Sequence, residues 1–239
     1  MYHTSDLHDH RGVVPELCAI RAKRPGFLFD CGDSLRGSQT VYHRREPILG
    51  ELAAAGYDAQ AMGNREFHYF FSAVEARARH MRHPLLCSNL IDTFGRALPF
   101  RSSLVLTEKE SGAVLHLLGL LIPQYAPHSF WERIFGWRFM DPFETVRRYA
   151  ADVPKGDALI VLSHIGLSLD RRLAAAVPRI DLILGGHSHD TLAQPEVVAK
   201  VPILHAGAYG AFVSSSQLSY DSSAQRWAIR DFALLPLLK

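Results

Sequence analysis

Five short segments of this chain each end in a residue type that binds metal ions. They are Asp6-Leu7-His8, Gly32-Asp33, Gly63-Asn64, Ser163-His164 and Gly186-His187-Ser188-His189. Four of them follow clear strand-like apolar runs, and the run before Gly63, residues 57–62, is weaker but readable. Because ligands gather beyond the carboxyl ends of parallel strands, we expect these side chains to meet at one sheet edge. Two carboxylates, one amide and four imidazoles would suit two divalent cations.

Strand-like runs alternate with helical patterns along most of the chain. The expected strands are 27–29, 57–62, 84–88, 158–162 and 181–184. The expected helices are 14–22, 47–55, 69–81, 142–153 and 168–177. This order predicts an α/β fold with parallel strands. Two hairpins, 103–107 with 114–121 and 213–220 with 227–234, add further strands. We therefore expect two mixed sheets packed face to face, with helices outside.

The motifs resemble those of the calcineurin-like metallophosphoesterases, and the residues within and around them resemble the 5'-nucleotidase branch of that family. The matching stretches are His3-Thr4-Ser5-Asp6-Leu7-His8, Gly63-Asn64-Arg65-Glu66-Phe67, and Val161 through Gly186-His187-Ser188-His189 to Gly210. The resemblance implies a four-layer α/β/β/α sandwich, with residues 1–239 as a single metallophosphoesterase domain. In that family a separate C-terminal domain usually supplies the nucleoside clamp. We expect no such nucleotide-specificity domain in this chain.

The resemblance also implies two metal sites. The first would comprise Asp6, His8, Asp33 and His189, and the second Asp33, Asn64, His164 and His187. Asp33 is expected to bridge the two cations, because a carboxylate carries two oxygens. Asp6 and His8 are two residues apart, so an extended segment would direct both side chains to one side. With nitrogen and oxygen ligands, the expected ions are manganese, iron or zinc. Cys31 is expected to be a buried thiol.

The main departure from the family pattern is at Arg65. The family reads Gly-Asn-His-Glu where this chain reads Gly-Asn-Arg-Glu, so arginine replaces the usual catalytic histidine. A guanidinium cannot act as an acid, but it can donate paired hydrogen bonds to phosphoryl oxygens. Three consequences are open: the leaving group needs no proton, His68 supplies it, or turnover is slow. Asn64, Arg65 and His68 are the candidate catalytic residues, and pairing of Arg65 with Glu66 or Glu75 is the alternative.

The sequence therefore predicts a dinuclear-metal phosphoesterase that acts on a small phosphorylated substrate, nucleotide-like esters included. One alternative is a metal-binding domain with little or no turnover that serves as a binding or regulatory module. Another is a hydrolase of sulfur esters, as in the sulfur-oxidising relatives of this family. The net charge of +2 and the scattered basic residues predict neither a nucleic-acid nor a membrane surface.

The remaining features concern the cell compartment and one aromatic stretch. Three cysteines are an odd number, which favours free thiols in a reducing compartment. The longest apolar run, 114–123, is too short to span a bilayer, so we expect a cytoplasmic protein. A removed signal peptide would leave the same sequence. Residues 124–140 are rich in aromatics with little periodicity, which favours a loop packed over a sheet edge rather than a lid.

Overall fold

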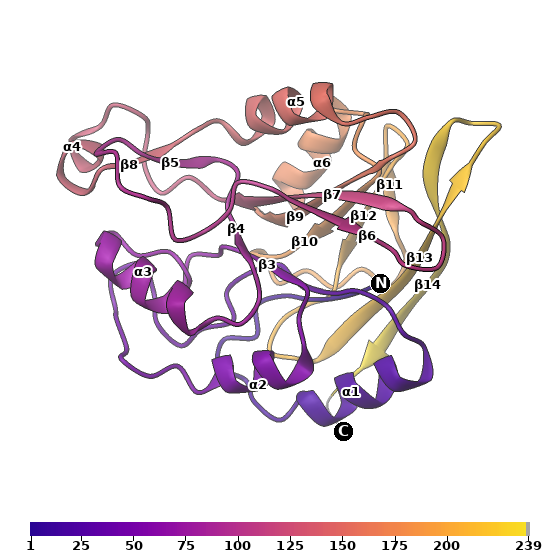
Figure 1. Ribbon diagram of the computed structural model, residues 1–239, viewed down its shortest axis with the longest axis horizontal. Coiled ribbons are helices and arrows are strands. Elements are labelled where there is room, and N and C mark those ends of the chain that lie inside the picture. The colour runs from indigo at the N-terminus through magenta and orange to yellow at the C-terminus, as the bar shows by residue number, and fades with distance from the viewer. Residues whose placement is uncertain (238–239) are drawn as a thin grey trace.

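Two six-stranded sheets pack face to face between two layers of helices in the computed structural model, which describes residues 1–237 (Figure 1). The order in the first sheet is β14 (Arg226–Pro236), β13 (Phe212–Asp221), β1 (Tyr2–Thr4), β2 (Leu28–Asp30), β3 (Ala59–Ala61) and β4 (Leu85–Leu86). The order in the second sheet is β11 (Glu196–Val198), β12 (Val201–His205), β10 (Leu182–Gly185), β9 (Ala158–His164), β7 (Val114–Leu121) and β6 (Leu104–Thr107).

The inner strands of both sheets are parallel. Strands β1, β2, β3 and β4 run in one direction, and so do β7, β9, β10 and β12. Strands β6, β11 and β13 add antiparallel pairs at the outer positions. The expected mixed sheets and four-layer sandwich are confirmed. The carboxyl ends of the parallel strands carry the predicted motifs to one edge of the sandwich.

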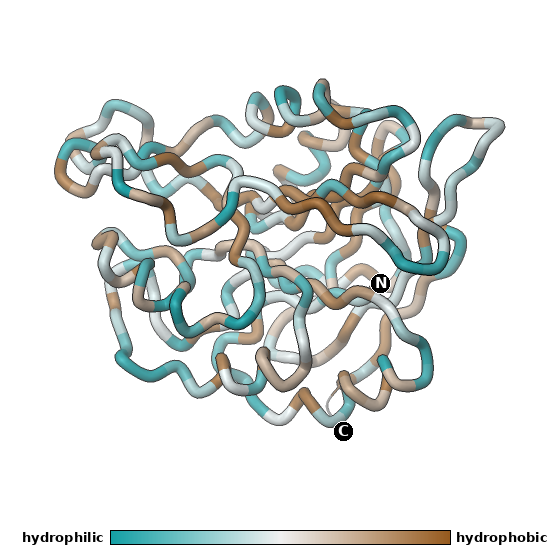
Figure 2. Tube along the Cα trace, in the orientation of Figure 1, coloured by the Kyte–Doolittle hydropathy of each residue, from teal (hydrophilic) through white to brown (hydrophobic). Residues whose placement is uncertain are grey.

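Each layer is held by its own apolar contacts. Helices α1 (Val14–Lys23) and α2 (Ile48–Ala55) pack on the first sheet, and α5 (Pro142–Asp152) and α6 (Leu167–Ala176) pack on the second. Helix α3 (Phe71–His80) buries Val74 beside Phe67 and Trp137. Between the sheets, Phe29 meets side chains such as Ile160 and Leu184. Figure 2 shows the hydrophobic trace concentrated on central strands such as β7.

The aromatic stretch is more regular than its sequence indicates. It contains α4 (Phe130–Phe135) and β8 (Trp137–Phe139), and β8 pairs with β5 (Leu90–Asp92) in a small extension seen at the left of Figure 1. The expectation of a loop was wrong, because a six-residue helix and a three-residue strand are too short to show periodicity. The packing interpretation is confirmed for Trp137 and Phe139, which are buried, whereas Phe130 and Trp131 stay exposed.

Two smaller expectations also have outcomes. The three cysteines are free, and Cys31 is buried with its thiol donating to the Leu184 carbonyl, 3.2 Å away. Among residues 1–237, no helix combines the length and the apolar character needed to cross a membrane.

Candidate metal centre and active site

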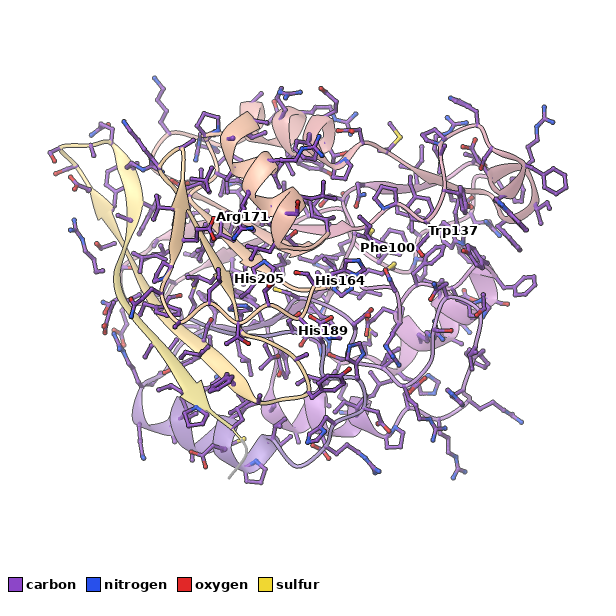
Figure 3. All side chains as sticks on the ribbon, turned by 180° about the vertical axis from the view of Figure 1, so that it is seen from behind. Phe100, Trp137, His164, Arg171, His189 and His205 are labelled. Carbon is purple, nitrogen blue, oxygen red and sulfur yellow. The ribbon has the colours of Figure 1, made fainter. Side chains whose placement is uncertain are left out.

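The predicted motifs of the two sheets meet at one edge, where hydrogen bonds join them. The His164 ring, at the end of β9, donates from Nδ1 to the carbonyl of Cys31, 2.7 Å away, just beyond β2. The backbone N–H of His187 donates to Asp6 Oδ2 at 2.9 Å. Figure 3 shows His164 and His189 together near the centre of the molecule, with His205 beside them. The two halves of the chain therefore build a single site.

One group of ligand-type atoms comprises Asp6, His8 and His189. The Nε2 atoms of the two imidazoles lie 2.9 Å apart. Asp6 Oδ1 lies 3.8 Å from His8 Nε2 and 3.5 Å from His189 Nε2. Asp6 Oδ1 is buried and has no hydrogen-bond partner among the described residues. A carboxylate oxygen and two imidazole nitrogens converging in this way fit a cation.

The second group comprises Asp6, Asp33 and His164. Because the carbonyl of Cys31 can only accept, Nδ1 of His164 carries a proton, and the neutral form of the ring offers Nε2 as a ligand. That Nε2 lies 3.3 Å from Asp33 Oδ1 and, within residues 1–237, has no hydrogen-bond partner. The carboxylate common to both groups is thus Asp6, whereas the sequence pattern favoured Asp33 as the bridge.

Two other predicted ligands, Asn64 and His187, follow β3 of the first sheet and β10 of the second. The centroid of the His187 ring is 5.0 Å from that of His164. Asn64 Oδ1 accepts a hydrogen bond from Gln124 Nε2 at 3.2 Å. The His187 side chain does not belong to the two compact groups of acidic, histidine or cysteine side chains found in the described part of the chain. The sequence did not predict the contact made by Gln124. This residue lies just after β7 and 60 residues from Asn64 along the chain, and nothing near it in the sequence resembles a motif.

The electrostatics of the site favour cation ligands. Burial lowers the pKa of His8 and of His187 to about 4, so both rings are neutral near pH 7, the form that binds metals. Burial also opposes charge on His164 and Asp33, but their mutual attraction outweighs it. The pKa of His164 is therefore raised to about 9, and that of Asp33 is lowered to about 2. A field that favours a proton at this point also favours a metal cation.

The backbone around the ligands is unusual. Asp6 and His8 have φ of 53° and 50°, so the segment is left-handed rather than extended as expected. The two side chains still converge, with Asp6 Oδ1 3.8 Å from His8 Nε2. Other residues with positive φ here are Asp33, His187 and His189. Left-handed non-glycine residues cost free energy and cluster at functional sites.

Two glycines are required by close approach. A Cβ on Gly186 would lie 1.9 Å from Ser5 Oγ, and one on Gly63 would lie 2.4 Å from both the backbone nitrogen and Oδ1 of Asp33. No side chain fits at such distances, so the glycines before His187 and Asn64 allow the strand ends to meet. This is the physical reason for the Gly-Gly-His and Gly-Asn pattern.

Glu66 fastens the loop that carries Asp33. Its carboxylate accepts from the backbone N–H groups of Asp33, Ser34 and Gly63 at 2.8–2.9 Å. We expect Glu66→Gln to lower the free energy of unfolding by about 2–5 kcal/mol, because the amide group would face N–H donors and leave them unsatisfied. The matched control Glu75→Gln removes an exposed carboxylate of α3 and should cost less than about 1 kcal/mol. Chemical denaturation measures both, and equal losses would contradict the anchoring role.

Arg65 lies beside the candidate metal groups. Its backbone N–H donates to Asp33 Oδ1 at 2.8 Å, and its side-chain Nε is 3.9 Å from Asp33 Oδ2. Nη1 turns away and donates to the carbonyl of Arg36 at 3.1 Å. Within residues 1–237 it forms no ion pair with Glu66, which accepts backbone N–H groups, or with Glu75, which pairs with Arg79. The side chain is about one-third exposed, so Nε and Nη2 remain available to a ligand.

His68 lies in an aromatic surrounding. Its Nδ1 accepts from the backbone N–H of Phe70 at 3.0 Å, and its ring stacks on that of Phe70. Burial, and then the charge of Arg77, lower its pKa. No contact within residues 1–237 joins it to the two ligand groups. This placement favours a structural role.

A buried polar network lies behind the second ligand group. His205 Nε2 and Asp170 Oδ2 are 2.8 Å apart, and Ser163, which precedes His164, donates to the same carboxylate. On the outer side, the ring of Tyr209 lies 5.2 Å from that of His8 and is half exposed. Tyr209 sits inside the stretch Ala206–Gly210 that carries the family resemblance, so a signal for it existed.

Comparisons with known proteins agree with this geometry. A family model described as calcineurin-like phosphoesterase matches residues 1–191. An uncharacterized metallophosphoesterase of Bacillus subtilis, YunD, is 29% identical over 238 residues, covering 93% of this chain and 50% of the relative. The 5'-nucleotidase of Rattus norvegicus is 26% identical over 227 residues, covering 84% of this chain and 39% of the relative.

Solved structures show the same fold. A 5'-nucleotidase precursor from Thermus thermophilus superposes with a TM-score of 0.81 at 21% identity, covering 98% of this chain and 54% of the other. The chain thus spans about half the length, or less, of these relatives. The match of the family model over most of the sequence, on the residues that build the two ligand groups, shows that the chain belongs to the calcineurin-like phosphoesterases.

Proposed function

We propose that this chain is a phosphoric ester hydrolase that uses two divalent metal ions. The observation that carries the proposal is the pair of ligand groups sharing Asp6, set at the strand ends of a calcineurin-like phosphoesterase. Phosphoryl transfer needs little covalent chemistry from the protein and depends on positioned charge. A site of this composition is suited to such a task.

The proposed ligand residues are the seven expected from the sequence, but the shared carboxylate is Asp6 in place of Asp33. The residues are Asp6, His8, Asp33, Asn64, His164, His187 and His189. The buried and unpartnered Asp6 Oδ1 and His164 Nε2, judged over residues 1–237, support the fit. Manganese, iron or zinc suits a mixture of imidazole and carboxylate ligands. When bound, such ions would supply Lewis-acid stabilisation of a phosphoryl group and an activated water nucleophile.

Arg65 is proposed to stabilise charge on the phosphoryl oxygens. Its Nε stands 3.9 Å from Asp33 Oδ2, so the guanidinium borders the place where a phosphate would lie between the ligand groups. A charge-assisted hydrogen bond from this group would strengthen as charge develops. The guanidinium remains protonated and supplies no proton to the leaving oxygen. We therefore propose substrates whose leaving groups are acidic enough to depart unaided.

The proposed substrate is a small phosphorylated compound. Relatives named 5'-nucleotidase support this class, but each extends well beyond the matched segment. A panel of aryl phosphates, nucleotides, phosphodiesters and sulfur esters, each assayed with Mn²⁺, Fe²⁺ and Zn²⁺, tests the proposal. We expect metal-dependent release of phosphate from at least one monoester. Metal binding without turnover of any ester would favour the regulatory module, and turnover of sulfur esters alone would favour the sulfur-ester reading.

His68→Ala tests the second possible source of a proton. Because Nδ1 of His68 accepts from the Phe70 backbone, we expect kcat/KM on alkyl phosphates to fall less than about threefold. The matched control is His83→Ala, another buried histidine, whose Nε2 meets Gln60 Oε1 at 2.8 Å. Steady-state kinetics decide between these outcomes. A loss of about a hundredfold or more, seen for His68→Ala alone, would identify His68 as the acid.

A further inference from the structure

A surface cavity of about 580 Å³ is lined by basic side chains alone, which we call the basic pocket. Its lining residues are Arg36, His43, Arg44, Arg45 and His80. Several arginines elsewhere are paired with acids, as Arg138 is with Glu132 at 2.6 Å. In the described part of the chain, no such ion pair involves a lining residue of the basic pocket. Like charges gathered around one hollow repel each other and attract an anion.

The loop that carries most of the basic pocket is held in place. The carboxylate of Glu46 accepts from the backbone N–H groups of Arg36 and Gly37 at 3.0 and 3.1 Å. The buried Arg77 donates to the carbonyl of Val41 at 2.8 Å. The Glu46 carboxylate therefore binds backbone N–H groups and, among the described residues, forms no ion pair with a residue that lines the basic pocket. The backbone at Arg36, Gly37 and Val41 is fixed by these contacts, which lowers the cost of ordering the loop on binding.

The lining residues offer donors suited to phosphate. Arg36 Nη2 is 3.1 Å from His43 Nδ1, and because a guanidinium only donates, His43 accepts there and carries its proton on Nε2. Arg44 and Arg45 are both exposed, and each guanidinium presents a planar fork of N–H groups. Such forks match the oxygens of phosphate in geometry and charge.

One residue, Arg65, connects the basic pocket to the candidate metal groups. Arg65 donates from its backbone to Asp33 and from Nη1 to the carbonyl of Arg36. We infer that the basic pocket binds a phosphate group other than the one that is hydrolysed. This inference rests on the proposed function. The bound phosphate belongs either to the same substrate, as in a bisphosphate, or to a free inorganic anion.

Binding of pyrophosphate to the chelator-treated, metal-free protein tests the pocket without relying on catalysis. The variant Arg44→Ala/Arg45→Ala removes two guanidinium groups from the pocket. The matched control, Arg147→Ala/Arg148→Ala, removes two adjacent exposed arginines of α5. Isothermal titration should show binding by the wild type and the control, and at least about tenfold weaker binding by the pocket variant. Equal binding by all three proteins, or none by the wild type, would overturn the inference.

A second measurement distinguishes the two sources of phosphate. Alkanediol bisphosphates of different lengths and their monophosphates are compared as inhibitors of p-nitrophenyl phosphate hydrolysis. If one ligand spans both sites, the best bisphosphate should inhibit at least about tenfold more strongly, and the pocket variant should lose this difference. Equal inhibition in every protein, with pyrophosphate binding intact, assigns the pocket to a free anion. Absence of any hydrolysis would refute the proposed function, while the titration still decides the pocket.

Discussion

Asp6→Asn is expected to lower both the metal content and the activity, because Asp6 is common to both ligand groups. We expect metal content to fall from about two ions per chain to less than one, and kcat/KM to fall at least about a thousandfold. Asp33→Asn should also abolish most activity but leave the first ion, at Asp6, His8 and His189, largely in place. Elemental analysis together with phosphate-release assays measures both effects.

Asp58→Asn is the matched control for this comparison. Asp58 accepts from the backbone of Leu28 at 2.8 Å and lies 3.5 Å from Arg21, at the amino end of β2, whereas the ligand Asp33 follows the carboxyl end of that strand. The substitution should change stability but not the number of bound ions. If Asp33→Asn emptied both sites while Asp6→Asn emptied only one, the bridging role would belong to Asp33, as the sequence pattern favoured.

Arg65→His is expected to increase kcat/KM on alkyl phosphates by about a hundredfold. A titratable donor would return where the leaving oxygen needs a proton, and general acids contribute roughly a hundred- to ten-thousand-fold. The wild type should instead show a rate that rises steeply as the leaving-group pKa falls. Linear free-energy plots over a series of aryl and alkyl phosphates measure both dependences.

Arg79→His is the control for this substitution, because Arg79 is an exposed arginine on α3 that pairs with Glu75. It should leave the plot unchanged. Arg65→Ala removes both the phosphate contact and the contact with the Arg36 carbonyl, whereas Arg65→Lys keeps the charge while losing the fork. A flat dependence on leaving-group pKa, with Arg65→Ala as active as the wild type, would show that Arg65 only supports the loop.

The parts of the fold that the sequence predicted share a local cause. Strand β9 is a continuous buried run that ends at His164, and β10 ends at the paired glycines before His187. Helix α5 begins where expected because Asp141 accepts from the backbone of Glu144 and Pro142 follows it. In each case the residues that decide the structure lie within a few positions of it.

The features that the sequence did not predict depend on distant partners. Asp6 faces the second sheet because the backbone of His187, 181 residues away, donates to it. The contact of Gln124 with Asn64 and the burial of Trp137 near His68 likewise join segments that no local pattern connects. The left-handed φ of Asp6 and His8 also escaped prediction, because non-glycine residues give little signal for it.

Anomalous diffraction from crystals of the protein loaded with Mn²⁺ is the most direct test of a dinuclear centre. We predict two peaks roughly 3.5–4 Å apart. One should lie among Asp6, His8 and His189, and the other among Asp6, Asp33 and His164. No peak at these groups, or a single peak whose ligands come from elsewhere in the chain, would contradict the account.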